Sequence, residues 1–146
     1  MRLLSRLLAV IATCAFFPAA HAGCTPASIA GWFAAGSTGA FYANPDVVVG
    51  VGHFGFDGVN RVSLTNWRQG QEGVVSTFTG VGTYTIDAYC RGTATFALKQ
   101  QSGASAGTMT MSFVVSGTPA SPRITGLVSH QVNQFTASVQ LEKIGF

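Results

Sequence analysis

Charged residues are scarce in this chain of 146 residues. Lysine and arginine together number eight, aspartate and glutamate number five, and charged residues make up only 9% of the sequence. The cationic residues form no run, so the sequence lacks the basic patch that a nucleic acid or an anionic membrane surface would require. We therefore expect no nucleic-acid partner.

Long hydrophobic runs are missing as well. The longest one, Leu7–Phe17, has about half of the roughly 20 residues that a membrane-spanning helix needs. It follows the basic residues Arg2 and Arg6 and precedes the small residues around Ala22, which is the order of parts in a secretory signal peptide. We predict cleavage near Ala22 and export of the remaining chain, either into the periplasm or out of the cell.

Removal of the signal peptide, residues 1–22, leaves residues 23–146 as one predicted domain. This part holds six basic and five acidic residues, a net charge of +1, so the basic character of the full sequence belongs partly to the leader. It contains no second apolar run that is long enough to anchor it. We expect a monomer with no integral membrane association after cleavage.

Cysteine is rare too. Of the three cysteines, Cys14 lies in the leader, so the mature chain keeps Cys24 and Cys90. An even pair in an oxidising compartment most simply forms a disulfide. Closing a loop of about 66 residues would remove roughly 4 kcal/mol of unfolded-chain entropy. Two cysteines and two distant histidines supply too few soft ligands for a metal site, so we expect no metal and no other cofactor.

A lipoprotein site is the alternative interpretation of Cys24. Such a site also places a cysteine directly after small residues, as Gly23 does here. It requires an aliphatic residue three positions before the cysteine, where this chain has His21. The disulfide is therefore the favoured interpretation.

Alternation of apolar and polar residues dominates the mature chain. In residues 108–116 the apolar positions are every second one and the intervening positions are mostly Thr and Ser, and residues 134–143 repeat the pattern. Strict alternation is typical of an antiparallel sheet with one face on a core and one in water. Helical periodicity is almost absent, and turn signals recur about every 8 to 12 residues, as in a sandwich or a barrel.

Eight strands are expected from these patterns, at residues 47–56, 61–68, 74–79, 82–89, 93–99, 108–116, 123–129 and 134–143. Residues 28–35 are interpreted as a short strand or a turn. The pair Asp57-Gly58 predicts a hairpin turn. About eight strands joined by short turns favour an all-β, antiparallel, up-and-down β-barrel, because closure removes the sheet edges. A β-sandwich is the alternative.

Two segments resemble a known pattern. Gly52–Gly58 reads GHFGFDG and Gly82–Thr93 reads GTYTIDAYCRGT. They are similar to a hairpin and a following G-x-Y-x-V-x-x-D-C-x-G-T motif in a group of small secreted microbial proteins. The resemblance covers Gly31 to Val115 and implies a barrel of the allene oxide cyclase and dirigent type, without implying an activity. The chain departs from the pattern at Asn60, Tyr89 and Arg91, so a role for the usual Asp before Cys90 is not carried over.

No motif assigns a catalytic residue. The segment Gly103–Gly107 matches G-x-S-x-G, but a nucleophile elbow needs a strand, a strained turn and a helix, whereas this segment lies between two expected strands. His53 is the one candidate for a general acid or base, on condition that its face of the strand 47–56 lines the barrel interior. The alternative is a hydrogen-bonded or solvent-facing strand histidine. His130 is expected in a loop.

Aromatic and methionine side chains are the candidates for a ligand site. A barrel of about eight strands is either filled by its own side chains or holds one small ligand. We predict a small apolar or aromatic ligand inside the barrel, contacted by Met109, Met111, Phe113, Phe96 and Tyr84, because small-molecule pockets are mostly apolar with a few polar groups. The alternatives are an enzyme of the cyclase or isomerase type that uses this cavity, and an extracellular surface or matrix scaffold.

Overall fold

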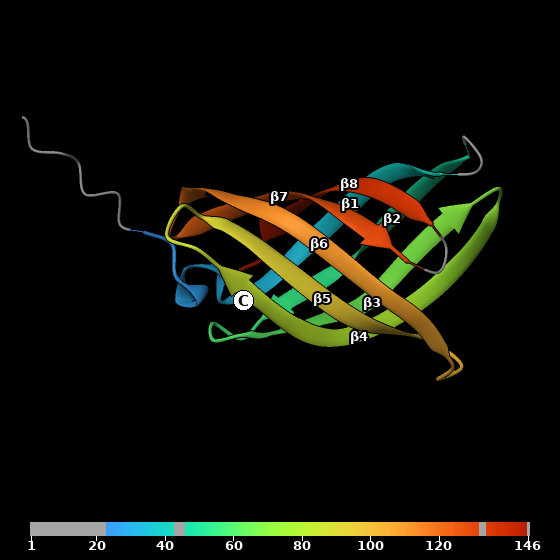
Figure 1. Ribbon diagram of the computed structural model, residues 1–146, viewed down its shortest axis with the longest axis horizontal. Coiled ribbons are helices and arrows are strands. Elements are labelled where there is room, and N and C mark those ends of the chain that lie inside the picture. Colours follow the sequence, from blue (N-terminus) through green and yellow to red (C-terminus); the bar gives the residue numbers. More distant parts are fainter. Residues whose placement is uncertain (1–22, 43–45, 132–133, 146) are drawn as a thin grey trace, which may run out of the picture.

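The alternating segments form eight strands that close into an antiparallel barrel (Figure 1). The structure, a computed structural model, describes residues 23–42, 46–131 and 134–145. Its strands are β1 (Gly31–Phe41), β2 (Val47–Phe56), β3 (Arg61–Gln71), β4 (Val74–Ile86), β5 (Arg91–Gln100), β6 (Ser105–Thr118), β7 (Ser121–His130) and β8 (Phe135–Lys143). Each strand pairs with the next, and β1 also pairs with β8. The up-and-down barrel is thus confirmed over the sandwich, while the predicted signal peptide lies outside the described residues.

Two strands differ from the expectation. The segments 74–79 and 82–89 belong to one strand, β4, and the segment interpreted as a short strand or turn contributes to the full-length strand β1. Strand β4 runs on through Gly82 because this glycine lies directly against β5. A Cβ atom at Gly82 would overlap the carbonyl oxygen of Thr95. The glycine that suggests a break in the sequence is therefore a point of close approach between two strands.

Inward-facing side chains form one continuous apolar core. The ring of Phe54 meets Trp67 and Phe96 edge to face, with centroid distances of 5.8 and 5.4 Å. Nearer the end of the barrel at which β1 begins, Phe56 meets Tyr84 in the same way, with a centroid distance of 5.0 Å. Each such pair contributes about 0.5–1.5 kcal/mol beyond the burial of its area. The barrel interior is thus filled by its own aromatic side chains.

The glycines of β2 make room for Trp67 in this interior. A side chain at Gly50 would overlap the Trp67 ring, and a Cβ atom at Gly52 would lie 2.8 Å from the Trp67 Cα atom. The pairing of β3 with both of its neighbours shifts register close to Trp67. The preceding residue, Asn66, has a φ of 51°, in the left-handed region. The irregularity and the glycines together admit the largest side chain of the core.

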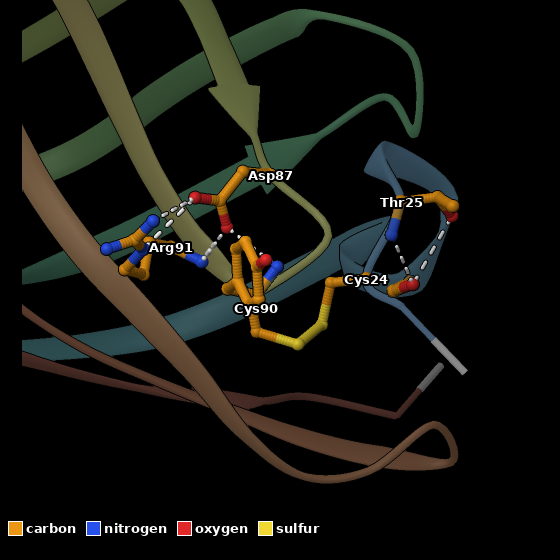
Figure 2. The surroundings of a disulfide bond; sticks show 7 residues. Cys24, Thr25, Asp87, Cys90 and Arg91 are labelled. Carbon is orange, nitrogen blue, oxygen red and sulfur yellow. Dashed lines mark hydrogen bonds and ion pairs between the residues drawn. A yellow bond between two sulfur atoms is a disulfide. The ribbon is translucent and has the colours of Figure 1, made fainter. Parts of the chain in front are cut away.

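The N-terminal segment closes one end of the barrel, the end at which β8 also terminates (Figure 1). Its short 3-10 helix, η1 (Pro26–Ile29), buries Ile29 completely in the core. The Tyr84 hydroxyl donates a hydrogen bond to the carbonyl oxygen of Pro26 at 3.2 Å. Figure 2 shows the disulfide between Cys24 and Cys90, which ties this segment to the turn between β4 and β5.

The predicted disulfide is thereby confirmed. A lipid thioether would need the same Cys24 sulfur, so the structure leaves no place for the lipoprotein alternative. Within the described parts of the chain, no helix combines the length and the apolar character needed to cross a bilayer.

Candidate functional site

His53 lies on the outer side of β2. The next residue, Phe54, points into the core and is fully buried, so the side chain of His53 points the other way. Its partners across the sheet, Ala34 on β1 and Thr65 on β3, also belong to the outer face. The condition for a general acid or base inside the barrel is therefore not met, and the structure corrects that interpretation to an outward-facing strand histidine.

The five residues predicted to bind a ligand all lie inside the barrel. Met109, Met111 and Phe96 are fully buried, and Tyr84 and Phe113 are at most 3% exposed. They come from the adjacent strands β4, β5 and β6, and their rings pack against aromatic rings of β2. A ligand at this place would have to displace core side chains. The structure brings these residues together as packing partners.

His130 is buried at the end of the barrel opposite η1. It is the last residue of β7 and not a loop residue as expected, and it is only 3% exposed. Its ring stacks on Phe135, and its Nε2 atom lies 2.8 Å from the carbonyl oxygen of Ala106. Burial lowers the pKa of His130 and so favours its neutral form. These contacts are those of a core histidine.

The outer wall carries a groove beside Trp32. It crosses β1 to β4 near the end closed by η1 and has a volume of about 580 Å³, within the usual range for small-molecule sites. The strand register places four of its residues in one row across these four strands: Trp32, Gly55, Ser63 and Val81. All four belong to the outer face, because each lies directly beside a buried residue of its strand.

The absence of a side chain at Gly55 shapes the groove. A Cβ atom there would lie 3.0 Å from the Cη2 and Cζ3 atoms of Trp32 and 2.8 Å from the Oγ atom of Ser63. The indole therefore lies across the backbone of β2, and Gly55 forms the floor beside it. Trp32 nevertheless stays 39% exposed. An exposed indole next to a depression offers a planar apolar surface on which a ring can stack.

Polar groups line the end of the groove that is nearest the β2–β3 turn. The Oδ1 atom of Asp57 accepts the backbone N–H groups of Val59, Asn60 and Arg61 at 2.8 to 2.9 Å. These hydrogen bonds, that of Val59 first, lower the pKa of Asp57 and hold its carboxylate in the turn. Arg61 and its partner across the sheet, Thr83, also line the groove. Over the described residues, Arg61 forms no ion pair within 4 Å.

A second groove, of about 620 Å³, crosses β2, β1 and β8 on the same outer wall. Its lining includes Ala34, Gly36, Val51 and Glu142, and no aromatic ring stands among its described lining residues. It provides a shallow surface of small, polar and acidic groups without a stacking surface. The Trp32 groove is therefore the candidate site.

Sequence reasoning did not find this groove. Trp32 and Arg61 lie on the non-adjacent strands β1 and β3, and only the register through Gly55 brings them to one place. One signal was present, because Phe33 continues the buried alternation of β1 and so places Trp32 on the outer face.

Neither a family model, nor a curated protein, nor a solved structure matches this chain. Its class therefore rests on the structure: a small closed barrel of eight antiparallel strands with one disulfide, a filled interior and an aromatic groove on its outer wall. The resemblance to small secreted microbial barrels stays a prediction.

Proposed function

We propose that this chain is an exported binding protein that takes a small apolar or aromatic ligand in the groove at Trp32. One observation carries the proposal: a partly exposed indole lies over a glycine floor and forms the wall of a groove large enough for a small molecule. Stacking a planar ligand there removes apolar surface of both partners from water, at about 25 cal/mol per Å². The disulfide supports export, because disulfides persist in oxidising compartments.

The groove replaces the barrel interior as the place of the ligand. The chemistry of the predicted ligand is retained, since both places are apolar and aromatic. Binding in the interior would break edge-to-face contacts such as that between Phe54 and Phe96, whereas binding in the groove displaces only water. The energetic cost of opening the core therefore favours the outer site.

The two tryptophans provide a direct test. Trp32 lies in the groove and Trp67 in the core, where it is 1% exposed, so each indole N–H reports on one of the two places. We would titrate the mature protein, labelled with ¹⁵N, with the uncharged probe 2-naphthamide and follow both indole signals by NMR. We expect a saturable shift of the Trp32 signal with that of Trp67 unchanged. A shift confined to Trp67 would move the site into the lumen, and no saturable shift at all would refute the proposed function.

Substitution of the indole sharpens the test. Trp32→Ala is expected to weaken naphthamide binding by about tenfold or more, because aromatic anchors dominate binding energies. Tyr89→Ala is the matched control, since Tyr89 is an aromatic residue with 79% exposure that lies outside the groove. Equal affinities of these two variants would contradict the assignment of the groove.

A further inference from the structure

Two hairpins of the barrel close in the same way. Asp57 in the β2–β3 turn and Asp87 in the β4–β5 turn each accept, on Oδ1, the backbone N–H of the arginine four residues later, at 2.9 Å. Each aspartate also donates its own N–H to the carbonyl oxygen of that arginine, Arg61 or Arg91, at 3.0 and 2.8 Å. The two arginines therefore begin their strands from equivalent positions, which makes their side chains comparable.

The two guanidinium groups have different partners. In Arg91, Nε donates to Oδ2 of Asp87 at 3.0 Å, Nη2 lies 3.0 Å from the same oxygen, and the guanidinium carbon is 5.3 Å from the centroid of the Tyr89 ring (Figure 2). Arg61 has Val59 where Arg91 has Tyr89, and it makes no comparable ion pair with Asp57 in the part of the chain that the structure describes. Arg61 is instead one of the residues that line the groove. The donors of Arg61 thus remain available to a ligand there.

The charge around the groove favours an anion. Arg61 lines it, and Lys143 lies at its β1 edge, where a Cβ atom on Gly31 would be 3.2 Å from the Lys143 Cε atom and 3.8 Å from its Nζ atom. Among the described residues that line the groove, Asp57 alone carries a carboxylate, and its Oδ1 atom already accepts three backbone N–H groups. One cationic residue in the groove and a second at its edge therefore accompany one carboxylate that is held in its own turn.

We infer that the ligand of this groove is an aromatic carboxylate, with its ring on Trp32 and its carboxylate on Arg61. A planar guanidinium matches a carboxylate with two parallel hydrogen bonds, and such charge-assisted bonds are stronger than neutral ones. The inference rests on the proposed function and adds to it the chemical class of the ligand and the residue that selects it. Arg61 acts here as a binding residue that separates acids from neutral compounds of the same shape.

Two probes with the same ring system test this inference. We would measure the affinities of 2-naphthoate and 2-naphthamide by calorimetry for the unchanged protein, Arg61→Gln and the matched control Arg68→Gln, which changes an exposed arginine of the same strand outside the groove. We expect the unchanged protein and Arg68→Gln to bind naphthoate about tenfold more tightly than naphthamide. Arg61→Gln should bind both probes with the affinity that the unchanged protein has for naphthamide. Added NaCl should reduce the preference, because salt screens exposed charges.

The outcomes separate the inference from the proposed function. Equal affinities of the unchanged protein for the two probes, or a preference for naphthoate that survives Arg61→Gln, would overturn the inference while the binding function stands. Failure of both probes to bind would overturn the function and the inference with it. Thermal unfolding of Arg61→Gln checks that it folds, and we expect its midpoint unchanged because the turn uses the backbone N–H of Arg61 and not its side chain.

Discussion

The turns of the β2–β3 and β4–β5 hairpins share the hydrogen bonds between an aspartate and the arginine four residues later, but the two hairpins are held to the barrel end by different means. The β4–β5 turn has its left-handed residue at Cys90, with a φ of 64°, and this residue is covalently bonded to Cys24. The β2–β3 turn has it at Gly58, with a φ of 81°, and Gly58 lies against Ala30, directly after η1. The same N-terminal segment is thus fastened to one hairpin by a disulfide and to the other by packing alone.

The two hairpins also differ in what their arginines contact. The β4–β5 hairpin pairs its arginine with its own aspartate and anchors the N-terminal segment. The β2–β3 hairpin leaves Arg61 at a groove and supplies the glycine floor at Gly55. We therefore propose that the same pair of an aspartate and an arginine four residues later serves stability in one turn and binding in the other, because the neighbouring side chains differ.

Removal of the disulfide is expected to have the largest effect. In the double variant Cys24→Ser, Cys90→Ser the free energy of unfolding should fall by about 4 kcal/mol, because the bond links residues 66 positions apart and restricts the unfolded chain. Urea unfolding measures this loss. Hydrogen exchange should speed up more in the β4–β5 turn than in the β2–β3 turn. Equal acceleration in both turns would show that the disulfide does not distinguish the hairpins.

A methyl group at Gly58 should disrupt the packing of the β2–β3 turn against the N-terminal segment. Gly58→Ala places a side chain in the left-handed region, and its Cβ atom would lie 2.9 Å from the Ala30 Cβ atom, so we expect a loss of about 1–2 kcal/mol. The matched change in the other hairpin is Ala88→Gly, whose φ is outside the left-handed region, and its cost should stay below about 1 kcal/mol. Urea unfolding compares the two variants, and the reverse order of their losses would contradict this account.

Much of the fold could be predicted from the sequence, because alternation marks strands with one buried face. Strands β6 and β8 show it without interruption, and the turn at Asp57-Gly58 and the disulfide follow from residue chemistry. Strand β1 was underestimated because its inward positions include the small residues Ala35 and Ser37, which weaken the pattern. Strand β4 was divided because Gly80 and Gly82 resemble a turn when their partner strand is unknown.

The groove and the filled interior could not be predicted in this way. Alternation shows which side chains point inward but not how much volume they fill, so Phe96 and Met109 fitted a ligand cavity as well as a packed core. The groove depends on register, since Trp32, Gly55 and Ser63 meet only when three strands are aligned. Of the two equivalent arginines, moreover, the sequence does not show which one is paired.

The smallest expected effect concerns acid stability, and it tests whether the two aspartates are equivalent. Backbone hydrogen bonds, from Val59 to Asp57 and from Arg91 to Asp87, lower the pKa of both carboxyl groups in the folded protein. A carboxyl group with a lowered pKa stabilises the fold above its unfolded value of about 3.9, and this contribution is lost as the pH falls through the folded pKa. The melting temperature should therefore fall on acidification below about pH 4, and it should fall less in Asp57→Asn and in Asp87→Asn.

Salt should separate the two variants. Asp87 also pairs with the exposed Arg91 side chain, so at neutral pH added NaCl should lower the melting temperature of Asp57→Asn, which keeps that pair, more than that of Asp87→Asn, which lacks it. Melting curves at neutral and acidic pH, each with and without 0.5 M NaCl, measure both differences; at this concentration the Debye length is roughly a seventh of that at 0.01 M. If the two variants respond equally to salt, Arg61 is engaged by Asp57 as Arg91 is by Asp87. In that case the guanidinium of Arg61 is not available to an acid in the groove, and the contrast between the two hairpins is lost.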